Sequence, residues 1–265
     1  MFRLKMELIM KQILPIICIL ALAVSANAKI VSKPVQYTQN GTVLEGYLAY
    51  DDASQGKRPG VLVVHEWWGL NDYVRSRVDK LARLGYVAFA LDMYGKGIWT
   101  KNPAEAKDLS GHLRGTPLMR ERAQAGLDIL KNNRQVDPAK IAAIGYCFGG
   151  TTVLELAYSG ADLAGVVTFH GGLTAAKPED HSRIKAKFLI CHGADDRFIS
   201  AEAINAFQDG MRKSGVDWQM IFFGGAVHGF TNPKADQYGI KGIAYNKKAD
   251  ERSWQYMQLF FKEIF

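Results

Sequence analysis

Short, almost uninterrupted apolar runs alternate with amphipathic segments along most of this sequence, and this alternation constrains the fold more than any other feature. Residues 60–65, for example, read Gly-Val-Leu-Val-Val-His. Runs of this kind are typical of strands buried on both faces of a parallel sheet. Similar runs occupy residues 86–91, 141–144, 165–169, 187–191 and 218–223. The alternation predicts an α/β fold with a mostly parallel central sheet and helices on both faces.

The segments between the apolar runs carry helical signals. Val74, Val78 and Leu81 recur at helical spacing after Asn71, a residue type that caps helix N-termini. Further helices are expected at residues 117–132, 149–158, 201–211 and 249–265. Asn40-Gly41 lies between two apolar segments and indicates a β-hairpin near the start of the fold. The sequence contains no repeat and no Gly-, Pro- or Ser-rich linker, so we expect one domain.

The first 28 residues have the pattern of a secretory signal peptide. An apolar run from Ile13 to Val24 follows Lys5 and Lys11, and Ser-Ala-Asn-Ala at positions 25–28 resembles a cleavage site. A membrane anchor is the alternative, but the run is short for a span of about 20 residues. We therefore expect residues 1–28 to be removed and residues 29–265 to form a periplasmic or secreted protein.

Charge and cysteine content exclude several classes of partner and site. The 265 residues carry a formal net charge of +7, but the basic residues are scattered, so we expect no nucleic-acid partner. Three cysteines are too few for a disulfide framework, and neither a Cys-x-x-Cys pair nor another metal-ligand spacing occurs. We expect no metal or other cofactor, and no stable membrane insertion once the signal peptide is removed.

A Gly-x-Cys-x-Gly motif directly follows one of the predicted strands. It reads Gly145-Tyr-Cys147-Phe-Gly149 and leads into a predicted helix. A nucleophile at such a strand-to-helix turn needs glycine on both flanks because the turn is too tight for larger side chains. The N-terminus of the helix favours a thiolate and a developing oxyanion. Cys147 is therefore the candidate nucleophile, with an inert buried cysteine as the alternative.

A thiol nucleophile needs a base and a group that orients the base, and candidates for both lie later in the chain. In α/β-hydrolases the chain order is nucleophile, acid, histidine. Asp195 and Asp196 follow one apolar run, and the spacing after Gly193 favours Asp196 over its neighbour. His228 follows the last run. The predicted triad is Cys147, Asp196 and His228, although aspartate is also common in turns.

With Glu66 in the segment Val-His-Glu-Trp-Trp-Gly at 64–69, these residues resemble the dienelactone hydrolase family. The similarity covers the chain from about Gly60 to its end. The resemblance implies an α/β-hydrolase fold and a lactone or carboxylic ester hydrolase that works through a cysteine acyl-thioester. It also implies that Glu66 holds the cysteine neutral until substrate arrives. The oxyanion hole would be formed by the backbone N–H groups of Trp67 and Phe148.

The expected substrate pocket departs from the family pattern in its charges. Members that cleave dienelactone hold its carboxylate with two arginines, and Lys96 and Asn232 stand at the corresponding positions here. With a single flexible cation left, neutral esters or lactones should be turned over as well as acids, or better. Lys101 and Lys234 are the remaining candidates for a second cation. The aromatic residues expected to line an apolar pocket, or alternatively to pack in the core, are Trp67, Trp68, Tyr94 and Phe230.

Two segments interrupt the alternation of strands and helices. Residues 95–113 and 231–246 both follow segments that should end at the same rim of the sheet, which makes them candidate walls or lids. The histidines that end apolar runs are expected to be structural, and they are His65, His170 and His192.

The two cysteines expected in the mature chain suggest a competing function. Cys147 and Cys191 in an oxidising compartment would suit a non-catalytic or thiol-redox-switched ligand-binding protein on the same fold. A bridge between them is geometrically doubtful because one starts a helix and the other ends a strand two units along the chain. A complete triad also favours the hydrolase.

Overall fold

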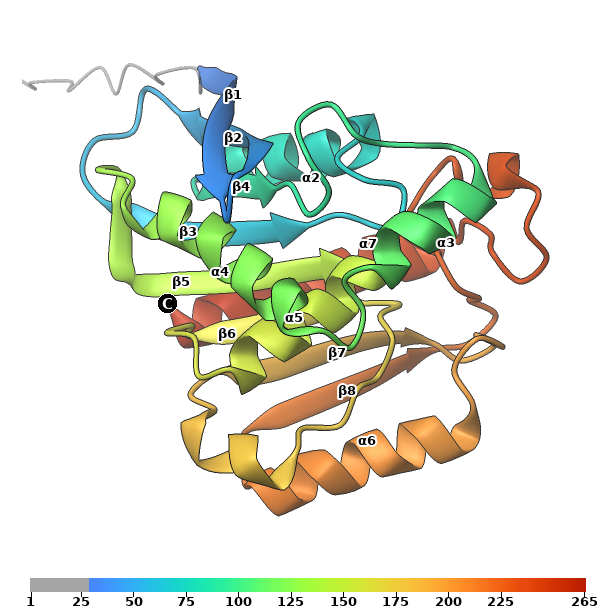
Figure 1. Cartoon of the computed structure of the whole chain (residues 1–265). Helices are drawn as coiled ribbons and strands as arrows, with labels where there is room; N and C mark the ends of the chain where they lie inside the picture. The colour runs from blue at the N-terminus through green and yellow to red at the C-terminus, as the bar shows by residue number, and fades with distance from the viewer. Residues whose placement is uncertain (1–28) are drawn as a thin grey trace, which may run out of the picture.

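The computed structural model describes residues 29–265, which form an eight-stranded sheet with helices on both faces (Figure 1). The predicted signal peptide lies outside the described residues. The strand order is β1-β2-β4-β3-β5-β6-β7-β8. The strands are β1 (Ile30–Gln39), β2 (Thr42–Asp51), β3 (Arg58–Val64), β4 (Val87–Leu91), β5 (Val136–Tyr146), β6 (Gly165–Phe169), β7 (Lys187–Gly193) and β8 (Trp218–Phe223).

The sheet is parallel from β4 to β8, and an antiparallel hairpin extends it beyond β4. The hairpin turns at Asn40-Gly41, as predicted, and both of these residues have a positive φ. β1 pairs with β2 along its whole length, from Ile30 opposite Asp51 to Gln39 opposite Thr42. The mostly parallel α/β sheet expected from the sequence is confirmed.

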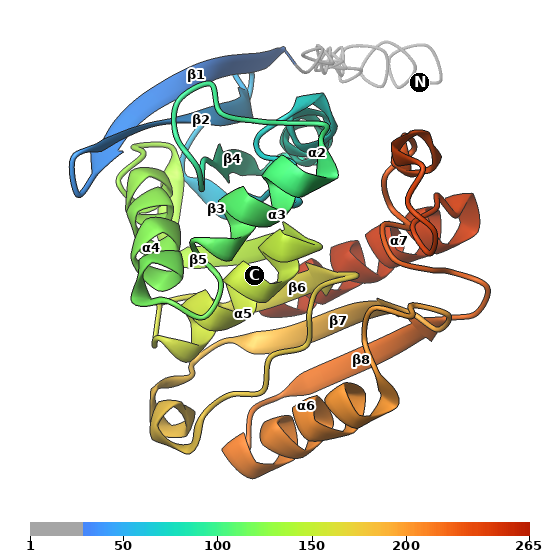
Figure 2. The ribbon, with the colours of Figure 1, turned by 45° about the vertical axis from the view of Figure 1, so that its right-hand side comes forward.

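The helices form two layers, one on each face of the sheet (Figure 2). α2 (Asp72–Arg83) and α7 (Lys247–Ile264) cover one face. α4 (Pro117–Lys131), α5 (Phe148–Tyr158) and α6 (Ala201–Ser214) cover the other. The connections between the longer elements contain three short helical segments, namely α3 (Pro103–Gly111), η1 (Pro178–Arg183) and η2 (Ala235–Tyr238). Asn71 caps α2 by accepting hydrogen bonds from two backbone N–H groups, as its residue type predicted.

The continuous apolar runs in the sequence form strands that are buried on both faces of the sheet. In β3, Leu62 and Val64 pack toward α4 and α5, whereas Val61 and Val63 pack toward α2 and α7. All five residues of β4 are buried, and so are all five of β6. Because successive side chains point to opposite faces of a strand, each residue of the run contributes to one of two separate cores.

The sheet brings the predicted functional residues to one edge. Parallel strands end at the same rim, and Glu66, Cys147, Asp196 and His228 follow β3, β5, β7 and β8 respectively. α3 also lies near this edge (Figure 1). No helix within residues 29–265 has both the length and the apolar character needed to cross a membrane.

Candidate active site

Cys147 occupies the turn between β5 and α5 in a backbone conformation that non-glycine residues rarely adopt. Its φ is 54° and its ψ is −114°. Both flanking glycines are required: a Cβ on Gly145 would lie 2.0 Å from the carbonyl oxygen of Gly149, and one on Gly149 would lie 2.2 Å from that of Val64. Strained backbone of this kind is concentrated at functional sites, where the surrounding structure holds it in place. The motif therefore folds as the tight turn that presents the thiol at the sheet edge.

His228 and Asp196 are joined by a direct hydrogen bond. The distance between His228 Nδ1 and Asp196 Oδ2 is 2.8 Å, and the other carboxylate oxygen accepts a hydrogen bond from the Phe198 backbone N–H. Asp196 is buried, whereas Asp195 is exposed. The structure thus places Asp196, the aspartate favoured by the sequence, where it orients the imidazole and leaves Nε2 for proton transfer.

The protonation of His228 depends on two neighbouring side chains. Burial disfavours the imidazolium, but the interactions with Cys147 and Asp196 outweigh burial and raise the pKa of His228 to about 10. Cys147 and His228 also line the same cavity. An imidazolium beside a thiolate is the ion pair that activates cysteine nucleophiles.

Glu66 is buried at the end of β3 and is held by an amide. The side-chain amide of Asn232 donates a hydrogen bond of 2.7 Å to Glu66 Oε2. Burial raises the pKa of Glu66 to about 7, although the Asn232 hydrogen bond and the positive charges of His228 and Arg77 act in the opposite direction. A carboxyl group with this pKa can hold or release a proton near neutral pH.

The two expected oxyanion donors come from different segments of the chain. Phe148 is the first residue of α5, so its N–H has no acceptor within the helix. Trp67 follows Glu66 after β3, and its backbone N–H has no protein acceptor among the described residues. Both N–H groups are therefore available to a bound oxyanion.

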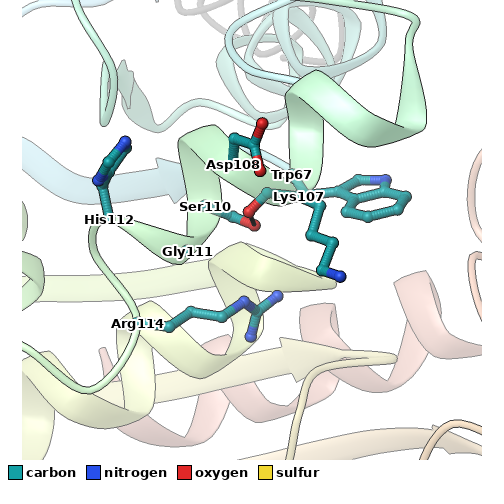
Figure 3. A pocket seen from close by; sticks show the side chains of 7 residues that line it. All are labelled: Trp67, Lys107, Asp108, Ser110, Gly111, His112 and Arg114. Atoms are coloured by element: carbon teal, nitrogen blue, oxygen red, sulfur yellow. Dashed lines mark hydrogen bonds between the residues drawn. The ribbon is translucent and has the colours of Figure 1, made fainter.

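A cavity of about 270 Å³ opens at Cys147 and is mostly apolar. The residues that line it are Trp67, Arg114, Cys147, Gly172, Phe198, Ile199, His228, Ile240 and Ile243. Trp67 and Arg114 also line an adjoining hollow of about 660 Å³ over α3, where Lys107 and Arg114 extend toward the same space (Figure 3). Both candidate wall segments contribute, since residues 231–246 supply the two isoleucines and residues 95–113 line the hollow.

The aromatic residues predicted for the pocket divide between cavity and core. Trp67 lines the cavity. Trp68 is buried and stacks on Tyr238, with ring centroids 4.1 Å apart. Phe230 is fully buried in the core. Tyr94 is buried beneath the site and donates a hydrogen bond to the Trp67 carbonyl, which makes it a support for the loop rather than a wall.

Comparison with known proteins identifies the family to which this arrangement belongs. Residues 44–265, from β2 to the end of the chain, match the dienelactone hydrolase family. The chain belongs to the dienelactone hydrolase family. The resemblance noted in the sequence is confirmed, and members of this family are lactone or ester hydrolases; this chain is therefore an enzyme of that class.

Related proteins support the family assignment over nearly their full length. The solved structure titled "m3DLH" is 43% identical, with a TM-score of 0.86 and coverage of 89% of this chain and 99% of that one. A dienelactone hydrolase-like promiscuous phosphotriesterase from metagenomic libraries, P91, gives the same values. A putative carboxymethylenebutenolidase of Aquifex aeolicus is 29% identical and covers 86% of this chain and 96% of its own.

The cations of this dienelactone hydrolase family member are not where the family pattern suggested. Lys96 Nζ lies 2.8 Å from Gln36 Oε1 and 3.4 Å from a Glu45 carboxylate oxygen, and it does not line the cavity at Cys147. Lys101 and Lys234 line a different hollow, beside the start of α2. The expectation that a lysine at one of these positions faces the substrate therefore does not match the geometry.

Arg114 is the cation that the sequence reasoning missed. It lines the cavity with Cys147, and its guanidinium lies 5.1 Å from the centre of the Phe148 ring. Arg114 sits in the polar connection between α3 and α4, and no motif distinguishes it there. Phe198 and Ile199 also line the cavity and were not predicted. Their only signal in the sequence is weak: they form an apolar pair just after Asp196, in a segment between a strand and a helix.

The three histidines that end apolar runs, namely His65, His170 and His192, are buried away from solvent, and so is Cys191. His65 accepts a hydrogen bond from the Met93 N–H at Nε2 and contacts the Glu66 carbonyl with Nδ1, and burial lowers its pKa, so it is a neutral structural group. Cys191 is buried, which raises its pKa. Cys147 and Cys191 are both free thiols in the described chain. His170, also buried, packs beside His228 with ring centroids 5.3 Å apart.

Proposed function

We propose that this hydrolase cleaves a lactone or carboxylic ester through a cysteine acyl-thioester. The observation that carries the proposal is the joint placement of three groups: Cys147 at a positive-φ turn, His228 lining the same cavity, and Asp196 hydrogen-bonded to His228 Nδ1. This placement supports nucleophilic acyl transfer, which requires a nucleophile, a base and an acid that orients the base.

The reaction follows from these contacts in two halves. The Cys147 thiolate attacks the carbonyl carbon, and the N–H groups of Trp67 and Phe148 hydrogen-bond to the oxyanion that forms. His228 gives its proton to the departing alkoxide as the C–O bond breaks, which leaves a thioester on Cys147. His228 then takes a proton from water, the resulting hydroxide attacks the thioester, and the acid is released with the thiolate.

Glu66 is placed to adjust charge during this cycle. Its pKa of about 7 allows it to be neutral or charged beside His228, and Asn232 orients its carboxyl group. In the role implied by the family resemblance, Glu66 would keep Cys147 protonated until substrate binds. The hydrogen bond from Asn232 would then have to weaken or be shared as Glu66 turns toward the thiol.

The cavity favours a substrate with an apolar acyl or alcohol group and tolerates one negative charge. Phe198, Ile199, Ile240 and Ile243 supply apolar surface, and Arg114 supplies a guanidinium at the boundary with the adjoining hollow. A single guanidinium can pair with a substrate carboxylate, but its exposure limits the gain in affinity. We propose neutral esters and lactones as substrates, with acidic analogues accepted through Arg114.

A second candidate activity is hydrolysis of phosphotriesters. A relative 43% identical over 89% of this chain is titled a promiscuous phosphotriesterase. The same thiolate could attack phosphorus and displace an aryloxide, with the phosphoryl oxygen in the place of the carbonyl oxygen. Release of 4-nitrophenolate from a diethyl aryl phosphate by the wild-type protein, and its absence with Cys147→Ala, would support this activity.

Trapping the covalent intermediate tests the main proposal. The protein is mixed with an activated ester, quenched in acid and digested, and the peptide that carries Cys147 is weighed by mass spectrometry. An acyl adduct on Cys147 that disappears when the ester is exhausted is the expected result. Turnover without an adduct on Cys147, at quench times shorter than one turnover, would contradict the thioester route.

We also propose that the protein is exported and acts in the periplasm or outside the cell. The apolar run and the Ala-x-Ala site before Lys29 support this location. An enzyme in that location would meet small-molecule esters or lactones from the environment.

A further inference from the structure

Tyr73 and Arg77, both on α2, contact the same residue in the loop that follows His228. The Tyr73 hydroxyl lies 2.6 Å from Thr231 Oγ1, and Arg77 donates a hydrogen bond to the Thr231 backbone carbonyl. Residues four positions apart lie on the same side of a helix. α2 therefore holds the side chain and the backbone of Thr231 together.

Arg77 is itself fixed by a buried ion pair and a ring of aromatic side chains. Its guanidinium pairs with Asp250 on α7 at 2.7 Å, and the two side chains are 3% and 8% exposed. The rings of Tyr73, Tyr146 and Trp254 surround the guanidinium at 5.1–5.6 Å. A buried ion pair adds little net stability compared with apolar packing of the same volume. Stability alone therefore does not account for the buried charge of Arg77 beside the loop that contains Thr231.

Thr231 transmits this restraint to the reacting groups in two directions. Its hydroxyl lies 2.7 Å from His170 Nε2, and the His170 ring packs edge-on against the His228 ring. The next residue, Asn232, donates to the Glu66 carboxylate. A shift of Thr231 would therefore displace the surroundings of both the base and the buried carboxyl group.

We propose that Tyr73 and Arg77 are positioning residues of the hydrolytic site, which act through Thr231 to hold His228 beside Cys147 and Asn232 against Glu66. The inference rests on the proposed roles of Cys147 and His228. Neither side chain lines the cavity at Cys147, so both act without touching substrate. Misplacement of a reacting group by about 1 Å can cost about 10²-fold in rate, so a loosened loop should reduce turnover more than binding.

Three variants and one matched control test the proposal. Arg77→Met removes the charge and the donor, Arg77→Lys keeps the charge with a compact donor, and Tyr73→Phe removes a single oxygen atom. The control is Arg120→Met, which breaks the Arg120–Asp180 pair (2.8 Å, with Asp180 2% exposed) on α4, on the other face of the sheet. All variants are assayed at a temperature where circular dichroism shows them folded.

The expected result is a loss in kcat without a matching change in KM. Arg77→Met should lower kcat by about 10- to 100-fold and Tyr73→Phe by about three- to tenfold, with KM within about threefold of wild type. Arg77→Lys should recover part of the loss. The rate at which iodoacetamide alkylates Cys147 at pH 7 should fall in the same order, because His228 is held less firmly beside the thiolate. Arg120→Met should keep wild-type kcat and alkylation rate.

Distinct outcomes overturn the positioning role and the proposed function. If Tyr73→Phe and the folded Arg77 variants keep kcat within twofold of wild type, or if Arg120→Met loses as much, the positioning role is wrong. Should Arg77→Met fail to fold, Tyr73→Phe and Arg77→Lys decide the matter. Cys147→Ala is assayed alongside: an active Cys147→Ala refutes the thioester mechanism and the positioning role together, whereas an inactive one with fully active α2 variants refutes the positioning role alone.

Discussion

Asn232 donates a hydrogen bond of 2.7 Å to the carboxylate of Glu66, across 166 positions of sequence. The family resemblance suggested that position 232 would face the substrate, where the dienelactone-cleaving members have a cation. In this chain the side-chain amide of Asn232 is buried and its hydrogen bond is made to the Glu66 carboxylate. Asn232 therefore supports Glu66, and among the described residues the cation that lines the cavity at Cys147 is Arg114.

We expect Cys147→Ala to abolish turnover and leave the fold intact. The covalent route is lost with the thiol, so kcat/KM for an activated ester should fall by at least about 10³-fold. The matched control is Cys191→Ala, which removes a buried thiol of the β7 strand outside the cavity and should cost about 1 kcal/mol of stability with kcat near wild type. Wild-type hydrolysis by Cys147→Ala would exclude this cysteine as the nucleophile.

The two adjacent aspartates should behave differently when each is changed to asparagine. Asp196→Asn removes the acceptor of the His228 Nδ1 hydrogen bond, and the equivalent change in a serine triad lowers kcat by about 10⁴-fold. Asp195→Asn changes an exposed side chain and should keep activity within about threefold. Both are measured against one activated ester. An inactive Asp195→Asn beside an active Asp196→Asn would reverse the assignment.

Glu66→Gln should change how stability depends on pH. Because the pKa of Glu66 is raised in the folded protein to about 7 from 4.5, the folded state binds this proton more tightly than the unfolded state. The resulting stabilisation is complete below pH 4.5 and is lost as the pH rises through 7, which amounts to about 3 kcal/mol. The free energy of unfolding of the wild type, relative to Glu66→Gln, should therefore decrease over this interval. A constant difference across it would show that Glu66 is not perturbed.

Arg114 should set the response to a negatively charged substrate. An exposed guanidinium contributes at most about 1 kcal/mol to an ion pair, so kcat/KM for a lactone that bears a carboxylate should exceed that for its neutral methyl ester by no more than about fivefold. Arg114→Gln should remove this preference and leave kcat/KM for the ester unchanged. Lys96→Gln is the control, since Lys96 Nζ is occupied by Gln36 and Glu45. Loss of the preference in Lys96→Gln but not in Arg114→Gln would show that the wrong cation was chosen.

Export should be accompanied by cleavage before Lys29. N-terminal sequencing of protein from the periplasm or medium should begin at Lys-Ile-Val. Ala26→Arg, which disrupts the Ala-x-Ala site, should leave an unprocessed chain in the membrane fraction. An intact N-terminus on the wild-type protein in that fraction would indicate an anchor instead.

The local pattern of the sequence determined the architecture and pointed to the proposed nucleophile. Apolar runs buried on both faces identify parallel strands because each residue of such a strand meets one of two cores. The turn at Cys147 was also readable locally in part, since Gly145 is required by the backbone of Gly149 four residues later, whereas Gly149 is required by the backbone of Val64 on the adjacent strand. Asp196 and His228 followed from their order after strands that end at one edge of the sheet.

Only the tertiary structure decided which charges and apolar groups surround Cys147. Lys96 was expected near the substrate and is instead bound to Gln36 and Glu45, whereas Arg114 reaches the cavity from a connection without a motif. The contacts of α2 with Thr231 also cross long stretches of sequence, since Arg77 is 154 positions and Tyr73 is 158 positions from Thr231. The physical reason is that periodicity and turn chemistry act over a few residues, but long side chains choose partners across folded elements, and those distances exist only once the layers have packed.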